Sequence, residues 1–390
     1  MFLPLLAEER SVAVSQEWHE ISVQTGPEDR PLLSALIRAV EFDRPFIAIC
    51  TVYSAAIFAF TWVNGKQGSI IFEHYLGISR AILVTFTFYL FAFTSLRNLV
   101  FGGPAGRLAA LVQGWRSAIE RVLLGVLPVL AVMTVFMTAF TAYKNQITDI
   151  VPFYFDQELA ALDEVLHFGR HPWEWLQPIL GTPSATGFIE LVYAATWGLA
   201  TFGMLYWQAL RTGRDRAQYL ITFALCWIVI GSVLATLMSS AGPPYYEYVA
   251  NADNPYVPLF EYLRGVSGGS GYSALEYQQY LWAVHVKHMT ASYTGISAMP
   301  SMHVSMATLV ALAAWRMSRL LGWIAIIHLV LIQIGSVHLG WHYATDGYLA
   351  IVMTVWIWQR SGSGTDNQIL APRAGLEPAT NRLTADRSTD

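Results

Sequence analysis

Eight long apolar stretches constrain this chain more than any other feature. Each comes near the roughly 20 residues that a helix needs to cross a hydrocarbon core about 30 Å thick. The stretches are too long for strands and do not alternate, and charged residues make up only 13% of the sequence. We therefore predict an all-α, polytopic membrane helix bundle. The predicted transmembrane helices are 46–64, 82–101, 122–142, 187–210, 217–239, 302–318, 321–337 and 343–359.

The arginines in the short loops predict the orientation of the bundle. They gather between spans two and three, four and five, and six and seven, which all fall on one face. By the positive-inside rule that face is cytoplasmic. We expect an integral protein of a cell inner membrane or an endomembrane, with both termini in the cytoplasm. The longer loops, 143–186 and 240–301, would then lie on the extracytoplasmic or lumenal side with any active site.

One candidate motif directly precedes the sixth span. Pro300 followed by Ser301 is a helix-start signal. The free N–H groups at such a helix end can receive a phosphate, and His303 would lie in the first turn beside it. Ser301 would either donate its hydroxyl to a phosphate oxygen or only cap the helix.

A second candidate motif lies between the seventh and eighth spans. His342 and Asp346 are four residues apart, which places them on one helical face if the span begins by His342. A carboxylate there can hold one imidazole N–H and leave the other nitrogen free to attack. A single histidine near a membrane boundary is more often structural. Two such motifs on one membrane face are more specific, because ionisable groups beside membrane helices are costly.

These two motifs carry a resemblance to a known family. Residues 300–303 and 342–346 resemble the second and third signature motifs of the type 2 phosphatidic acid phosphatase superfamily. Residues 295–301 are more similar to its inositol phosphorylceramide synthase branch, an inositolphosphotransferase of sphingolipid synthesis. That branch's first motif resembles residues 241–246 here. The substrate-binding candidates in this segment are Pro243, Pro244 and Tyr245.

The resemblance implies a mechanism without a metal or a cofactor. His342 would attack phosphorus and form a phosphohistidine, Asp346 would orient it, and His303 would protonate the departing oxygen. Water or an acceptor hydroxyl would then resolve the intermediate. An acid and a base working together predict a bell-shaped pH profile.

The sequence also departs from the phosphatases of that superfamily, because expected cations are missing. The position six residues before His342, an arginine in those phosphatases, is Ser336 here, and the first motif has no basic residue. A phosphate without a nearby positive charge would be poorly held. The possible substitutes, each of which could equally be an ordinary loop or structural residue, are Arg264, Lys287, His288 and His338.

The resemblance covers residues 118–360 and implies a six-helix phosphatase-like catalytic core. Before it we expect a cytoplasmic arm (1–45), then two accessory transmembrane helices with an interfacial segment (46–117). The polar segment 361–390 predicts a disordered tail.

Three functions remain open at this point. The first is hydrolysis of a lipid phosphate or phosphodiester, and the second is transfer of a phospho-headgroup to a ceramide- or diacylglycerol-like acceptor. The third is a non-catalytic lipid transporter or binding protein. In each case the partners are the membrane and a lipid. The net charge of −4 gives no support to nucleic-acid binding.

Overall fold

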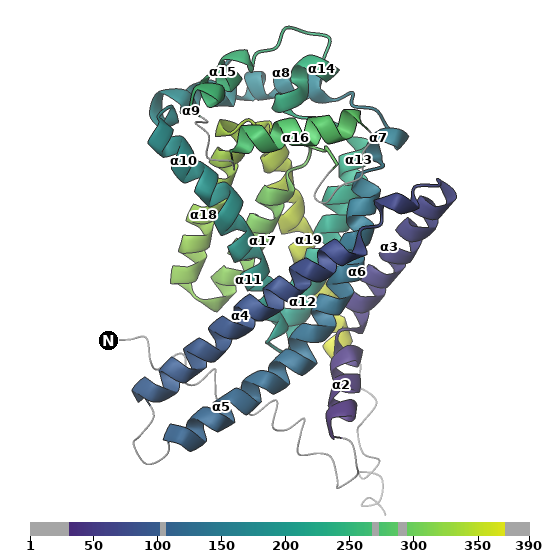
Figure 1. Ribbon diagram of the computed structural model, residues 1–390, viewed down its shortest axis with the longest axis vertical. Helices are drawn as coiled ribbons and strands as arrows, with labels where there is room; N and C mark the ends of the chain where they lie inside the picture. Colours follow the sequence, from purple (N-terminus) through teal and green to yellow (C-terminus); the bar gives the residue numbers. More distant parts are fainter. Residues whose placement is uncertain (1–30, 102–106, 267–272, 288–294, 371–390) are drawn as a thin grey trace, which may run out of the picture.

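The computed structural model describes residues 31–101, 107–266, 273–287 and 295–370, and within these ranges the chain forms helices and no strands. The prediction of an all-α polytopic bundle is confirmed (Figure 1). The long helices of the bundle, some continued by π-helical turns, are α3 (Arg44–Val63), α4 (Phe72–Phe101), α6 (Leu127–Lys144), α11 (Trp197–Ala209), α12 (Arg214–Leu225), α17 (Met302–Met317), α18 (Arg319–His338) and α19 (Ala344–Leu370).

Six helical segments in the described part of the chain are long and apolar enough to cross a membrane. They contain α3, α4, α6, α11, α12 and α18. The other two predicted spans form α17, which has only 16 residues, and α19. All eight predicted spans are therefore helices, and six of them meet the length and hydropathy required of a membrane span.

The segment predicted to be interfacial belongs to a longer helix than expected. It forms α5 (Arg107–Arg121), which continues through the π-helical turn η2 (Val122–Val126) into α6. Pro128, which has no N–H to donate, follows this wider turn without breaking the helix. Two further π-helical turns, η3 (Val192–Thr196) and η4 (Cys226–Leu234), interrupt other bundle helices.

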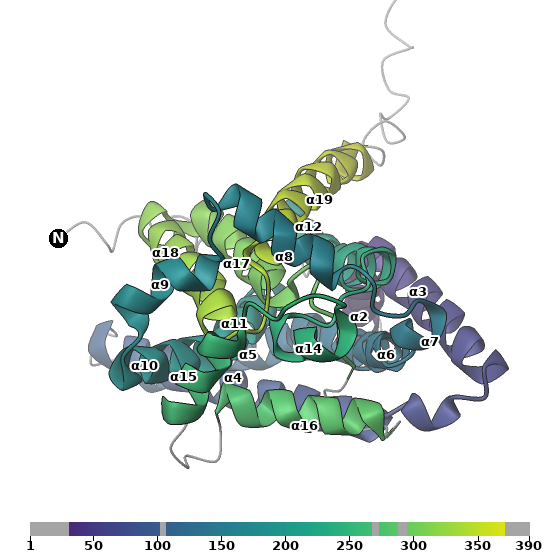
Figure 2. The ribbon, with the colours of Figure 1, turned by 90° about the horizontal axis from the view of Figure 1, so that it is seen from above.

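A layer of short helices lies across one end of the bundle (Figure 1). It is built from the two long loops, and seen from above α14 lies between α8 and α16 (Figure 2). The loop after the fifth span is therefore helical over much of its described length, although its glycine-rich centre at 267–272 lies outside the described residues. The remaining short helices are α2 (Pro31–Phe42), η1 (Gln67–Ser69), α7 (Ile147–Ile150), α8 (Asp156–Leu166), α9 (Pro172–Leu180), α10 (Pro183–Leu191), α13 (Ala235–Leu237), η5 (Pro243–Tyr245), α14 (Tyr246–Val249), α15 (Val257–Val266) and α16 (Ala274–Val286).

The opposite end of the bundle is held by a buried ion pair. The guanidinium of Arg216 on α12 donates to both carboxylate oxygens of Asp43, at 3.0 and 2.6 Å. Both side chains are only 4% exposed. Arg216 precedes the fifth predicted span, which begins at residue 217, and so belongs to the arginines of the loop between spans four and five. In the structure it joins α12 to the start of α3 and does not face solvent.

The final helix runs beyond its predicted end. We predicted a disordered tail from residue 361, whereas α19 continues to Leu370. Ser361 is buried, and a Cβ added to Gly362 would lie 2.6 Å from the Gln218 amide nitrogen, so glycine allows this close packing on α12. The rest of the predicted tail, 371–390, and residues 1–30 of the predicted arm lie outside the described residues.

Candidate active site

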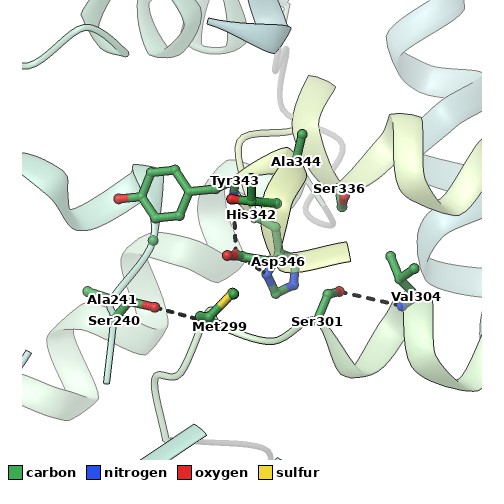
Figure 3. Close-up of polar contacts among 12 residues, drawn as sticks. Ser240, Ala241, Met299, Ser301, Val304, Ser336, His342, Tyr343, Ala344 and Asp346 are labelled. Carbon is green, nitrogen blue, oxygen red and sulfur yellow. Dashed lines mark hydrogen bonds and ion pairs between the residues drawn. The ribbon is translucent and has the colours of Figure 1, made fainter. Parts of the chain in front are cut away.

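Three chain segments meet beneath the layer of short helices, and they are the three motif segments. The carbonyl of Ser240 accepts the N–H of Ala298 at 2.9 Å, and the Ser240 hydroxyl accepts the N–H of Met299 at 3.0 Å (Figure 3). These bonds join the first motif to the second. The N–H of Ser301 donates to the carbonyl of Asp346 at 3.1 Å, which joins the second motif to the third.

Gly242 lies at the point where the three segments come closest. Its φ is +97°, a backbone conformation that favours glycine. A Cβ at this position would lie 3.0 Å from the Cβ of Ala298 and 3.0 Å from the carbonyl oxygen of Trp341. A side chain at this position would push Ala298 and Trp341 apart by a few tenths of an ångström, in addition to straining the backbone.

His342 and Asp346 form the predicted pair. His342 Nδ1 lies 3.1 Å from Asp346 Oδ2, and the side chains are 10% and 0% exposed (Figure 3). When Asp346 is ionised, its carboxylate only accepts hydrogen bonds, and a neutral His342 ring then donates from Nδ1 and keeps the lone pair of Nε2. This is the tautomer that a nitrogen nucleophile needs.

The pair meets by a different route from the one we predicted. α19 begins at Ala344, so His342 precedes the helix instead of lying on its face. Asp346, in the first turn, reaches back toward the chain that enters the helix and also accepts the N–H of Tyr343 at 3.1 Å. This is the backward bond of a capping box, and it holds the histidine beside the carboxylate.

The backbone of His342 is held by Ser336. Its carbonyl accepts the N–H groups of Trp341 at 2.8 Å and His342 at 3.0 Å, as α18 ends and the chain turns. The Ser336 hydroxyl donates to the carbonyl of Gln333 at 2.7 Å. The position where the related phosphatases carry arginine therefore supplies a backbone acceptor and no cation.

His303 is held between two aromatic rings at the start of α17. Its ring stacks on Tyr193 at 4.6 Å and 16°, and the Trp197 ring lies 4.3 Å away at 38°. Trp197 also donates its indole N–H to the His303 carbonyl at 2.9 Å. Tyr193 lies in the π-helical turn η3, a turn type often found at functional sites. His303 is near enough to His342 for the charge on one to act on the other.

Ser301 caps α17, as one of its two predicted roles requires. Its hydroxyl accepts the N–H of Val304 at 3.4 Å, and the side chain is fully buried. The helix starts at Met302, which confirms the helix-start prediction from Pro300 and Ser301. His303 therefore lies in the first turn, among the N–H groups that can face an anion.

The segments that meet here all fall within one family match. A family model described as the PAP2 superfamily matches residues 157–359, more than half of the chain. The chain belongs to the PAP2 superfamily. Comparison with curated proteins and with solved structures gives no match. Membership of the PAP2 superfamily together with the apolar helices supports a membrane lipid phosphatase type of function.

Two aspartates that the sequence analysis did not single out hold motif segments of this candidate site together. Asp156 and Asp163 are seven residues apart on one face of α8, and both are buried. Asp156 accepts the N–H groups of Ala241 and Gly242 at 2.8 and 2.7 Å, and the Tyr343 hydroxyl at 2.8 Å. It therefore joins the first and third motifs.

Asp163 holds the start of α19 in the same way. Its carboxylate accepts the N–H groups of Ala344 at 2.7 Å and Thr345 at 3.0 Å. Burial raises the pKa of the Asp156 and Asp163 carboxyls above its ordinary value, and the backbone hydrogen bonds oppose that rise. The signal that could have found them is two acids on one face of a short helix that adjoins the motifs.

The first-motif residues have structural contacts in the PAP2 site. Pro243 and Pro244 start η5, and Pro243 is buried. The Tyr245 hydroxyl donates to the carbonyl of Gln278 on α16 at 2.9 Å. The Gln278 amide in turn donates to the carbonyl of Leu339 at 2.9 Å, so α16 is bonded to both the first and the third motif segments.

The predicted substitute cations make no described hydrogen bond or ion pair with His342, whose described side-chain partner is Asp346. Arg264 and Lys287 are exposed. His338 is fully buried at the end of α18, and its Nε2 lies 2.9 Å from the Thr186 hydroxyl. His288 lies outside the described residues.

Proposed function

We propose that this protein is an integral membrane enzyme that cleaves a lipid phosphate or phosphodiester through a phosphohistidine on His342. The observation that carries the proposal is the bond between His342 Nδ1 and the buried carboxylate of Asp346. It leaves Nε2 as the attacking atom and stabilises the imidazolium as it forms. A carboxylate in this position orients the ring and does not itself need to take the proton.

The proposed reaction has two steps. His342 Nε2 attacks phosphorus while the bond from phosphorus to the lipid oxygen breaks, and protonated His303 gives its proton to that oxygen. Water or an acceptor hydroxyl then attacks the phosphohistidine, the P–N bond breaks, and His303 takes the proton of the attacking group. The enzyme returns to its starting protonation, and no metal or cofactor enters either step.

We place this chemistry at the extracytoplasmic or lumenal face, with both termini in the cytoplasm. The arginine-rich loops support the placement, because they lie at the end of the bundle away from α8 and the motifs (Figure 1). We also propose the six-helix core at 118–360, preceded by two accessory spans. Within the core, the phosphate-binding candidates remain Ser301, Pro243, Pro244, Tyr245, Arg264, Lys287 and His338.

Headgroup transfer is the second candidate. The similarity of residues 295–301 to the inositol phosphorylceramide synthase branch favours an acceptor hydroxyl in place of water. Product analysis with purified protein separates the two reactions. Released inorganic phosphate supports hydrolysis of a phosphate monoester, whereas a new headgroup on added ceramide or diacylglycerol supports transfer.

Trapping the phosphoenzyme tests the proposed nucleophile. A lipid phosphate labelled with radioactive phosphorus should leave an acid-labile label on the protein, and His342→Ala should abolish it. His328→Ala is a matched control, because His328 lies in the middle of α18 and its Nε2 contacts Thr196 at 3.1 Å. An acid-labile label that persists in His342→Ala would show that His342 is not the nucleophile.

The leaving group tests the role of His303. His303→Ala should slow cleavage of a lipid alkyl phosphate by about 10²- to 10⁴-fold. It should slow cleavage of a nitrophenyl ester much less, because that leaving group needs no proton. If both histidine variants turn over every lipid phosphate tested as the unmodified protein does, a non-catalytic lipid transporter or binding protein becomes the better description.

A further inference from the structure

Lys144 is the last residue of α6. We call the site formed by His303 and His342 the histidine site. The backbone at Gly295 passes directly over it, because a Cβ at Gly295 would lie 3.0 Å from Lys144 Cγ and 2.8 Å from Asn145 Oδ1. Residue 295 begins the described segment that leads through Ser301 into His303. Lys144 therefore lies next to the start of the segment that leads to the second motif.

The face of α6 that bears Lys144 packs on η4 at Gly231, which also adjoins the start of α17. Phe140 lies one turn before Lys144, and a Cβ at Gly231 would meet both the Phe140 ring at 2.8 Å and Met302 Sδ at 3.2 Å. Met302 immediately precedes His303. The charge of Lys144 is near enough to act on the His303 imidazole.

Lys144 also differs from the other two lysines of the sequence. Lys66 pairs with Asp149 at 3.3 Å and is 51% exposed, and Lys287 is exposed. Lys144 is partly buried, and no described carboxylate lies within 4.0 Å of its ammonium group. A partly buried ammonium without an anionic partner is suited to an anion that arrives with the substrate.

The histidine site needs such a cation. Ser336 supplies only backbone and hydroxyl groups, and the first motif contributes prolines and a tyrosine whose hydroxyl is bonded to Gln278. Transfer of a phosphoryl group places negative charge on the non-bridging oxygens, which a fixed positive charge stabilises. Lys144 belongs to a helix that precedes the family match at 157–359.

We propose that Lys144 is the cation that binds the phosphate group of the substrate beside His303 and His342. The inference rests on the proposed function, and it names a residue outside the motif segments. The ammonium would contact a non-bridging phosphate oxygen, while the N–H groups at the start of α17 contact another.

Amine labelling of the unmodified protein tests this inference without any substitution. The protein is reductively methylated in the absence and presence of orthophosphate or orthovanadate, at concentrations that inhibit turnover, and each lysine is read by mass spectrometry. Lys144 should react about tenfold more slowly with the anion present. Lys66, which pairs with Asp149, serves as the internal control and should not change. Equal labelling of Lys144 with and without an inhibiting concentration of anion overturns the proposal.

Substitution gives a second, independent readout. Lys144→Met should reduce kcat/KM for a lipid phosphate and weaken orthophosphate inhibition, each by about 10- to 100-fold, the range for a lost charge-assisted hydrogen bond. Lys144→Arg should recover much of both, and Lys66→Met should change neither. If Lys144→Met does not purify as a folded protein, Lys144→Gln and the labelling experiment carry the test.

The outcomes separate this inference from the proposed function. Turnover that depends on His342 but is unchanged in Lys144→Met overturns the role of Lys144 alone. Anion protection of Lys144 in a protein whose turnover survives His342→Ala overturns the phosphohistidine and leaves the anion site in place.

Discussion

Tyr343 donates a hydrogen bond of 2.8 Å to Oδ1 of Asp156, although the two residues are 187 positions apart in the chain. The same carboxylate accepts the N–H groups of Ala241 and Gly242. One side chain on α8 therefore sets the distance between the first motif and the residue that follows the proposed nucleophile. The precision of the site depends on a helix that contributes no group to the proposed chemistry.

Asp156→Asn should lower both stability and activity. An amide keeps one acceptor but turns its NH2 group toward a backbone N–H, and a buried donor left without a partner costs about 1–3 kcal/mol. We expect the apparent melting temperature in detergent to fall by several degrees and turnover to fall more than about tenfold. Asp149→Asn is the control, because Asp149 is 47% exposed in an ion pair with Lys66 and such pairs contribute about 0–1 kcal/mol. Equal effects of the two changes would show that the hydrogen bonds to Asp156 do not hold the motif segments in place.

The raised pKa of Asp163 predicts a pH dependence with a definite sign. A carboxyl whose pKa is higher in the folded protein than in the unfolded chain contributes stability below its unfolded value, and that contribution is lost as the pH rises through the folded value. The difference in melting temperature between the unmodified protein and Asp163→Asn should therefore shrink as the pH rises from about 4. A difference that grows with pH would mean that the bonds from Ala344 and Thr345 outweigh burial.

Gly242→Ala should be more damaging than a change at another left-handed glycine. An alanine at Gly242 meets Ala298 and Trp341 at 3.0 Å in addition to the backbone strain. Gly213→Ala has the strain alone, because Gly213 has a φ of +80° and nothing within 4 Å of its added Cβ. Both glycines combine a positive φ with an extended ψ, of 170° at Gly242 and −169° at Gly213, and a side chain in this conformation costs about 1–3 kcal/mol. A larger loss of melting temperature and turnover in Gly242→Ala therefore measures the motif contact. Equal losses would mean that the junction relaxes easily.

Tyr193 should affect turnover by stacking its ring on His303 and not through its hydroxyl. Tyr193→Phe keeps the stacked ring and removes a buried hydroxyl that has no hydrogen-bond partner among the described residues, so kcat should change little. Tyr193→Leu removes the stacking, worth about 0.5–1.5 kcal/mol, and should lower kcat about 2- to 10-fold and alter the pH profile. A large loss in Tyr193→Phe would instead assign the hydroxyl a part in binding or proton transfer.

Much of the site was predictable because its signals are local. Pro300 followed by Ser301 predicts a helix start from those two residues alone. The four-residue spacing of His342 and Asp346 predicts that their side chains can contact each other. The apolar stretches likewise predicted helices without any knowledge of their neighbours. The predicted eighth span begins at residue 343, one residue before the observed start of α19 at Ala344, because the capping bond to Tyr343 depends on geometry at the helix end.

The amino-acid sequence by itself determined the membrane bundle, the order of its helices and the three motif segments, since length and hydropathy act residue by residue. Only the tertiary structure decided what surrounds the histidines. Asp156 and Asp163 accept hydrogen bonds from residues more than 80 positions away in the chain, and Lys144 packs against Gly295 over a similar separation. No local propensity specifies such a partner. Packing chose these partners, because a buried carboxylate must find donors and only the folded bundle brings those donors to it.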